Sequence, residues 1–180
     1  MATSFGAKAG VNFTSVANAQ VSNLTFTPGM KTDFHLGAVA NFHFGYRSEG
    51  SPVGTGLFGL QTELLYSRQG FTWKDETVRF DYLTLPVMAK YYATRQINIE
   101  AGPYIGYLIN VAPDATLIDG THISFANLKG GIDAGIAVGA GYEALSGFIV
   151  GARYMLGLTE MTKNLPWRNS GFALSVGWLF

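Results

Sequence analysis

The sequence predicts an all-β protein, an eight-stranded antiparallel up-and-down transmembrane β-barrel, and three observations lead to this fold. First, residues 171–180 alternate bulky apolar with small side chains over about 10 residues, the strand length that crosses a bilayer in a tilted barrel. Second, only 13% of residues are charged and 48% are hydrophobic, whereas a soluble domain has roughly 25% charged residues. Third, the apolar runs are interrupted at every second residue, so no stretch predicts a transmembrane helix.

The same alternation recurs along the whole chain. Successive side chains of an extended segment point to opposite sides, so each segment has one bulky apolar face and one small or polar face. The predicted strands span residues 4–14, 33–47, 57–68, 78–92, 96–111, 131–143, 147–158 and 171–180. Pro86 removes one ladder donor from the fourth strand and predicts a bulge or local irregularity there. We expect one domain over residues 1–180, because an even number of strands suits closure.

Volume decides which face of this barrel meets lipid. An eight-stranded barrel is just wide enough inside for ordinary side chains, so the Gly-rich face fits the interior and the bulky face does not. A soluble lipocalin-like binding barrel is the disfavoured alternative, since it would place the bulky face inside. The outward aromatics predict two girdles at the membrane interfaces. Their members include Tyr46, Tyr66, Tyr91, Tyr142, Tyr154, Trp178 and Phe180.

The connections between strands differ in length and distinguish the two ends of the barrel. Links near 47–56, 93–95 and 144–146 are mostly short, and those at 15–31, 69–77, 112–129 and 159–168 are longer. Short turns belong on the periplasmic side of an outer-membrane barrel, with long loops outside the cell. Asp119-Gly120, between two apolar segments, predicts a two-residue hairpin that continues the sheet beyond the membrane.

These features predict a location in the outer membrane of a Gram-negative bacterium, with outer-membrane lipid as a partner. No signal peptide precedes Ser4, so Met1-Ala2 resembles an added start before a mature chain, and we expect an exported precursor. The formal net charge is zero and the basic residues are scattered, which excludes the electrostatic footprint of a nucleic-acid-binding protein.

Charged residues in the lumen phase form the main candidate site. They are Lys8, Glu63, Lys90, Glu100, Asp133, Glu143 and Arg153. Buried charges need partners, so we interpret them as a paired polar core. Their estimated heights pair Glu63 with Arg153 and Glu100 with Lys90. An ion or proton path is the functional alternative, disfavoured because eight strands leave no open channel.

Other motifs give weak signals for chemistry. His122-Ile123-Ser124 has the His-x-Ser spacing of outer-membrane lipid-modifying enzymes, with Asp133 or Glu143 as conceivable orienting acids. A histidine just after a hairpin turn is usually a solvated polar residue, so we expect no enzyme. His35 and His43 are about 26 Å apart along a strand, too far for one metal. We expect no catalytic, cofactor or metal site.

Large aromatics in the long loops form the candidate partner surface. They are Phe71, Trp73, Phe125 and Trp167. Their predicted positions outside the bilayer leave two interpretations, a cap on the barrel mouth or a binding site for a partner. Alanine substitution at Trp73 and Trp167 distinguishes the two.

Several segments together resemble the PorT-like outer-membrane β-barrel family of Bacteroidetes. They are residues 5–12, 63–70, 82–92, 101–106 and 133–143, with the aromatic C-terminus. The name-giving member of this family serves a protein secretion system, a role that barrel motifs alone do not transfer. We expect a structural or adaptor role, presenting extracellular loops or serving an envelope or secretion complex. The terminal Phe180 resembles the signal recognised by the outer-membrane assembly machinery. A narrow pore and then a lipid-modifying enzyme similar to lipid A deacylases are the alternatives.

Overall fold

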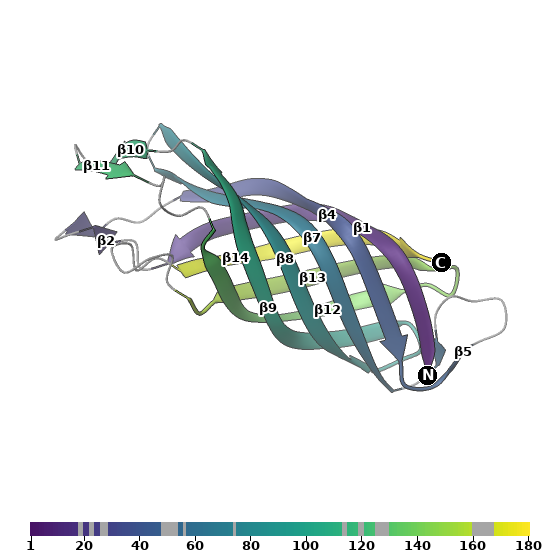
Figure 1. Ribbon diagram of the computed structural model, residues 1–180. Helices are drawn as coiled ribbons and strands as arrows, with labels where there is room; N and C mark the ends of the chain where they lie inside the picture. The colour runs from purple at the N-terminus through teal and green to yellow at the C-terminus, as the bar shows by residue number, and fades with distance from the viewer. Residues whose placement is uncertain are drawn as a thin grey trace.

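The computed structural model describes all residues except 18–19, 22–23, 26–28, 48–53, 56, 74, 113–114, 119–120, 125–129 and 160–167. The described residues form a closed barrel of eight strands in the order β1-β14-β13-β12-β9-β8-β7-β4 (Figure 1). These strands are β1 (Ala2–Ala17), β4 (Gly29–His43), β7 (Phe58–Trp73), β8 (Glu76–Tyr92), β9 (Ile97–Ala112), β12 (Ile132–Glu143), β13 (Phe148–Gly157) and β14 (Arg168–Leu179). Every neighbouring pair is antiparallel, and β1 pairs with β14 to close the cylinder. The predicted fold class is confirmed.

Both chain termini lie at one end of the barrel, and the opposite end is called the loop end below (Figure 1). Short links 93–96 and 144–147 join strands at the terminal end, which is typical of the periplasmic side. The link after β4 is longer than predicted, because β4 ends at His43 and a separate pair of strands follows. These are β5 (Tyr46–Arg47) and β6 (Gly54–Thr55).

The long link expected at 69–77 is wrong. Strands β7 and β8 remain paired up to Trp73 and Glu76, so only a tight turn joins them. Alternation continues there, since Phe71 and Val78 both point inward and are buried. Intervening polar residues such as Gln69 made this region resemble a loop.

The hairpin predicted around residues 119–120 is confirmed. Strand β10 (Ala115–Ile118) pairs with β11 (Thr121–Ser124), and Ile118 faces Thr121. The two strands form a sheet of their own rather than an extension of the barrel sheet, which corrects the expected continuation. A second small sheet at the loop end pairs β2 (Gln20–Val21) with β3 (Leu24–Thr25).

Side-chain exposure separates the two faces as the volume argument required. Outward residues such as Phe5, Ile99 and Val176 are exposed, whereas inward Glu63 and Gln61 are buried. The soluble alternative, with the bulky face inside, is therefore wrong. The outward face includes Tyr91, Tyr142, Tyr154, Trp178 and Phe180, all exposed, and half-buried Tyr66. Tyr46 differs from the expectation, because it belongs to β5 outside the barrel sheet.

No helix among the described residues is long and apolar enough to cross a membrane.

At Pro86 the structure has the local irregularity that the sequence predicts, but not the alternative of a bulge. The ladder between β7 and β8 omits Pro86 but resumes in the same register, with Thr62 facing Val87 and Leu65 facing Thr84. A missing N–H thus interrupts the ladder without inserting a residue. The register shifts instead between Asp81 and Tyr82, where β8 meets β9.

A second register shift separates β4 from β7 between Met30 and His35. Side chains of β1 reach across this gap to the backbone of β7. Asn12 Nδ2 donates to Arg68 O at 2.9 Å and to Phe34 O at 3.2 Å. Thr14 Oγ1 accepts from Gly70 N at 3.0 Å. These bonds satisfy backbone groups that the interrupted ladder leaves without a strand partner.

Candidate functional site: the charged lumen

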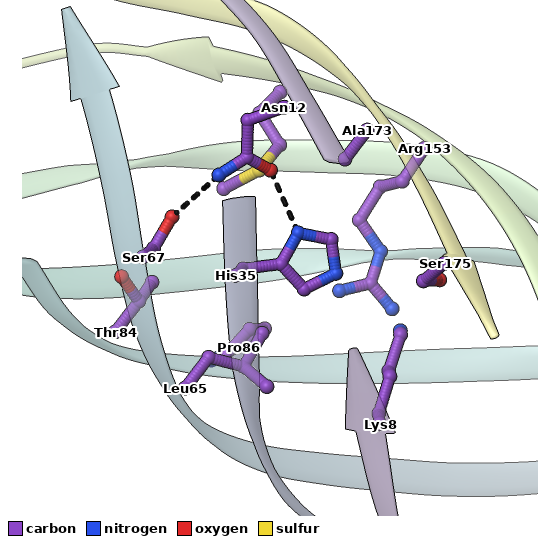
Figure 2. Close-up of a pocket in the computed structure, with 11 residues that line it drawn as sticks. Lys8, Asn12, His35, Leu65, Ser67, Thr84, Pro86, Arg153, Ala173 and Ser175 are labelled. Atoms are coloured by element: carbon purple, nitrogen blue, oxygen red, sulfur yellow. Dashed lines mark hydrogen bonds between the residues drawn. The ribbon is translucent and has the colours of Figure 1, made fainter. Parts of the chain in front are cut away.

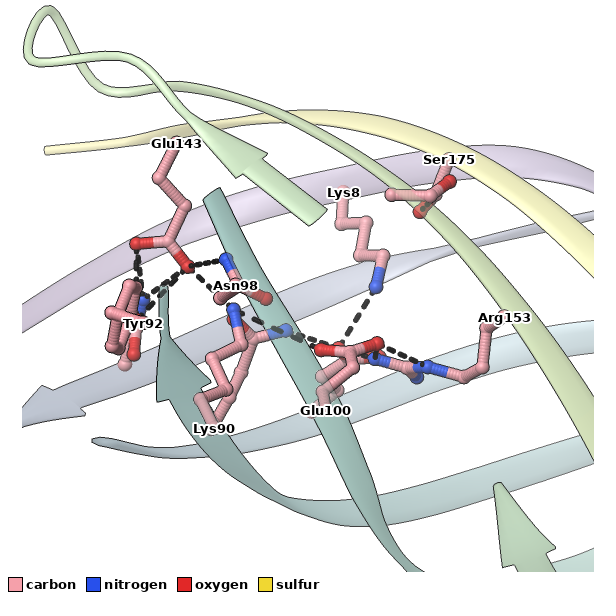
Figure 3. A network of polar contacts seen from close by, with 12 residues as sticks. Lys8, Lys90, Tyr92, Asn98, Glu100, Glu143, Arg153 and Ser175 are labelled. Atoms are coloured by element: carbon pink, nitrogen blue, oxygen red, sulfur yellow. Dashed lines mark hydrogen bonds and ion pairs between the residues drawn. The ribbon is translucent and has the colours of Figure 1, made fainter. Parts of the chain in front are cut away.

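Four strands contribute one charged residue each to a central cluster, defined as Lys8, Glu63, Glu100 and Arg153. Figure 3 labels Lys8, Glu100 and Arg153 of this cluster. Arg153 binds Glu63 through two bonds, Nη2 to Oε1 at 2.8 Å and Nη1 to Oε2 at 3.0 Å. Its Nε donates to Glu100 Oε1 at 2.8 Å, and Lys8 Nζ lies 2.9 Å from Glu63 Oε1. The mutual attraction and the hydrogen bonds of these charges offset the large desolvation penalty of burying them.

A second cluster surrounds Glu143 nearer the terminal end. Lys90 Nζ lies 2.5 Å from Glu143 Oε1, and Tyr92 Oη donates to the same oxygen at 3.1 Å. Amide nitrogens of Asn41 and Asn98 each donate at 3.2 Å. Figure 3 shows Lys90, Tyr92 and Asn98 converging on this carboxylate. The Glu143 cluster therefore combines one ion pair with several neutral donors.

Lys90 links the two clusters, because its Nζ also lies 3.8 Å from Glu100 Oε2. Both pairs expected from strand heights, Glu63 with Arg153 and Glu100 with Lys90, are thus in contact. The linked clusters contain three cations and three carboxylates, so the formal charges cancel. The residues Lys8, Glu63, Lys90, Glu100, Glu143 and Arg153 are all buried.

Asp133 lies apart from this network, although it has the same inward phase. Thr159 Oγ1 donates to Asp133 Oδ1 at 3.0 Å, and Asn169 Nδ2 donates to Asp133 Oδ2 at 3.2 Å. Asn169 Nδ2 also donates to Tyr82 Oη at 2.9 Å. Asp133 is therefore held by a hydroxyl and an amide rather than by a cation.

Several polar members of the lumen were not singled out in the sequence. Asn12, Asn41, Asn98 and Tyr92 bind charged or backbone groups inside the barrel. In the sequence, these residues are distinguished only by their inward position on a strand. Many residues without such contacts share that position. Which partner each one meets depends on strands far apart in sequence.

Figure 2 shows a small cavity beside the central cluster, between Lys8, Arg153 and His35. His35 Nδ1 lies 2.8 Å from Asn12 Oδ1. Counted over positions that the centre of a water molecule can occupy, the volume is about 20 Å³, enough for one water but not for a metabolite. Thr84 Oγ1 lines the cavity and has no protein partner.

A second cavity of about 20 Å³ lies on the other side of Lys8, next to Gln61 and Asn98. The side-chain oxygens of Gln61 and Asn98 are buried and unbonded, as expected for groups that bind internal water. Towards the terminal end, the rings of His43 and Tyr92 are 4.6 Å apart, and both residues are buried. Each of these two cavities therefore has room for about one water.

The structure describes only part of the candidate partner surface. Phe71 is wrong as a surface residue, because it is 0% exposed and its ring centroid lies 6.3 Å from that of Phe80 inside the barrel. Its strand alternation continues past the predicted end, which turns it inward. Trp73 ends β7, and its side chain lies outside the described part. Phe125 and Trp167 fall in the ranges that the structure does not describe.

The structure does not test the candidate catalytic residues, and it places the two described histidines beside different groups. His122 and Ser124 lie on β11, and their side chains are outside the description. His35 Nδ1 lies 2.8 Å from Asn12 Oδ1, whereas His43 Nε2 lies 3.5 Å from Glu143 Oε2. Within the described ranges, no three His, Asp or Glu residues are grouped so that they could hold a metal ion.

A closed lumen with a lipid-facing apolar wall is typical of small outer-membrane barrels. Residues 2–163 match the family described as outer membrane protein beta-barrel domain. The chain belongs to this family. It is therefore an outer-membrane protein of a Gram-negative bacterium. None of the curated protein sequences matches it significantly.

Solved outer-membrane barrels share this fold. The attachment invasion locus protein Ail of Yersinia pestis is 12% identical, with 100% of both chains covered and a TM-score of 0.55. Neisserial surface protein A is 14% identical, with 98% of this chain and 97% of that chain covered and a TM-score of 0.54. OprG of Pseudomonas aeruginosa is 11% identical over 99% and 96%, with a TM-score of 0.50. At such low identity the similarity concerns the fold alone.

Proposed function

We propose that this outer-membrane barrel is a non-conducting, non-enzymatic anchor that presents its extracellular loops to an envelope or secretion complex. The observation that carries the proposal is the neutralised lumen network around Arg153, Glu63 and Glu100. It occupies the lumen where a pore would need open space. Function then resides in the parts beyond the membrane.

The cavity sizes support this proposal over a narrow pore. Each cavity beside Lys8 has about 20 Å³ for water centres, close to the requirement of one buried water. A hydrated ion needs a wider path, and the cations and carboxylates along this route already neutralise one another. A pore would require several of these ion pairs to separate together.

The resemblance to the PorT-like family supports the choice of an envelope or secretion complex as partner. The resembling segments lie on barrel strands β1, β7, β8, β9 and β12, so they concern the barrel rather than its loops. Partner choice within such a family would therefore depend on the loops.

We also propose that β14, which closes the barrel against β1 and is followed by exposed Phe180, is recognised by the outer-membrane assembly machinery.

Affinity capture from native membranes tests the anchor proposal. Tagged wild-type protein, Trp73→Ala and Trp167→Ala are purified in mild detergent, and co-purifying envelope proteins are quantified. Trp178→Ala is the matched control, because this tryptophan is exposed on β14 near the terminal end. We expect recovery of the partner to fall about tenfold in the loop variants and to stay unchanged in the control.

Equal recovery of the same proteins by all four chains would show that Trp73 and Trp167 are not part of a partner-binding surface. Stable ion-selective openings in single-channel recordings of the wild type would overturn the non-conducting role. Release of acyl chains from lipopolysaccharide by the purified protein would overturn the non-enzymatic role.

A further inference from the structure

His35 on β4 lies in the lumen beside the break in the β4–β7 ladder and next to the central cluster. It is 4% exposed. The ring edge with Cε1 and Nε2 lies against the backbone of Gly10 on β1, where a Cβ would be 2.6 and 2.8 Å from these two atoms. Figure 2 shows Asn12 on one side of the ring and the charged ends of Lys8 and Arg153 on the other. The ring therefore stands between the ladder break and the charges.

Asn12 fixes which nitrogen of this ring carries the proton. Its Nδ2 lies 3.2 Å from Phe34 O and 2.9 Å from Arg68 O, and carbonyl oxygens only accept hydrogen bonds. The other end of the amide is therefore the oxygen, and this Oδ1 lies 2.8 Å from His35 Nδ1. Because Nδ1 must donate to Oδ1, Nε2 of the neutral ring has a lone pair and no proton.

That lone pair meets the cavity beside the central cluster. Nε2 of His35 has no hydrogen-bond partner among the described residues, and it lies on the side of the ring that faces Lys8 and Arg153 (Figure 2). Lys8 Nζ has three N–H groups, yet Glu63 Oε1 is its one acceptor within the described ranges. A buried acceptor and a buried donor thus border one cavity without contacting each other, and both need a partner.

The chemistry of the cavity selects its ligand. Lys8 and Arg153 repel a cation. The lone pair of His35 Nε2 repels an anion, and the ion pairs of the linked clusters are already neutral. A water molecule can donate to Nε2 and accept from Lys8 Nζ at the same time. The volume of about 20 Å³ for water centres suits one such molecule.

We infer that one internal water binds between His35 Nε2 and Lys8 Nζ and makes Asn12 and the central cluster a single cooperative unit. Asn12 orients the ring, the ring presents Nε2, and the water completes the bonding of Lys8. Without Asn12 the ring can turn over, which puts a C–H group where Nε2 was and removes the acceptor of the water. This unit lies inside the barrel, so it is independent of the loop partner of the anchor proposal.

Nuclear magnetic resonance of the wild-type barrel in detergent micelles tests the water site directly. Long-range ¹H–¹⁵N spectra identify the protonated nitrogen of His35, and cross-relaxation with water detects a bound molecule at its Cε1–H. We expect the proton on Nδ1 and a water contact that is lost in Asn12→Ala. A proton on Nε2, or a wild-type ring without a water contact, would overturn the inference.

A double-mutant cycle tests the cooperativity. Urea unfolding is compared for wild type, Asn12→Ala, Lys8→Met and the double variant. We expect the fold-change in the unfolding equilibrium constant caused by Asn12→Ala to be about fivefold smaller in the Lys8→Met background, because the water has lost its donor there. Equal fold-changes in both backgrounds would show that Asn12 and the cluster act independently.

Thr14→Val is the matched control for the cycle. Thr14 lies on the same strand as Asn12 and also bonds across to β7, but its hydroxyl contacts Gly70 rather than His35. Its fold-change should be the same with Lys8 and with Met at position 8. A similar dependence for Thr14→Val and Asn12→Ala would assign the coupling to the strand as a whole and refute the water bridge. The resonance experiment needs only the wild type to decide the site if Lys8→Met does not fold.

Discussion

Arg153 on β13 and Glu63 on β7 bind each other across the whole width of the barrel. The two strands stand four places apart in either direction round the ring of eight, yet the two side chains form a bidentate pair at 2.8 and 3.0 Å. No backbone ladder joins these walls. The pair therefore connects opposite walls that are otherwise linked only through the strands between them.

Replacing Glu63 by Gln should strongly destabilise the barrel. The change leaves Arg153 with Glu100 alone and leaves Lys8 Nζ without its carboxylate at 2.9 Å. Removing one partner of a buried ion pair costs about 3–5 kcal/mol. Equilibrium urea unfolding in detergent micelles, followed by tryptophan fluorescence, measures the loss in free energy of unfolding.

Two comparisons make the Glu63 result specific. Asp75→Asn removes an exposed carboxylate from the β7–β8 turn and should change the unfolding free energy by less than about 0.5 kcal/mol. Glu100→Gln should cost less than Glu63→Gln, because Arg153 keeps its bidentate partner. A Glu63→Gln barrel as stable as wild type would refute the role of the cross-lumen pair.

The lumen partners could be anticipated from sequence because strand phase has a period of two residues. Glu63 and Arg153 share the inward phase at similar heights, and these two facts were enough to pair them. Asp133 has the same phase but meets Thr159 and Asn169. Those contacts depend on how β12 and the link after β13 approach β14, which the alternation does not encode.

Strand ends were the least predictable part of the fold. Between Ser67 and the loop end of β7, polar side chains face outward where lipid would require apolar ones. The alternation there no longer resembles that of a membrane strand. Inward Phe71 and Phe80 nevertheless continue the barrel there. A strand that leaves the bilayer keeps its inward-facing residues but loses its outward apolar face. The strand end predicted from the sequence therefore comes too early.

Gly10 on β1 should tolerate no side chain. A Cβ at this position would lie 2.0 Å from Leu174 O and 2.6 Å from the His35 ring, so the backbone of β14 or the ring must move. Gly10→Ala should lower the free energy of unfolding by about 1–3 kcal/mol, measured by the same urea titration. Gly151→Ala is the matched control, since its Cβ meets only Ser175 Oγ at 3.3 Å and Ala140 O at 3.7 Å. Equal stability of the two variants would contradict the close approach.

Asn12 should hold the interrupted seam between β4 and β7 closed. Its amide nitrogen, which has two N–H groups, lies within hydrogen-bonding distance of Phe34 O on β4 and of Ser67 Oγ and Arg68 O on β7, beside the break in the ladder. Asn12→Ala leaves these acceptors unbonded inside the barrel, at a cost of about 1–3 kcal/mol.

The seam makes the effect of Asn12→Ala local, so hydrogen exchange with mass spectrometry is the informative measurement. Segment 30–35 of β4 should exchange faster, by about tenfold or more, because local opening there no longer breaks the bonds of Asn12. Segment 36–43 of the same strand should keep its exchange rate, since its ladder to β7 is continuous. Asn110→Ala is a matched control, because Asn110 bonds Asp81 on the outer wall away from the seam. Uniform acceleration along β4 would mean that Asn12 stabilises the barrel globally and that the seam is closed by something else.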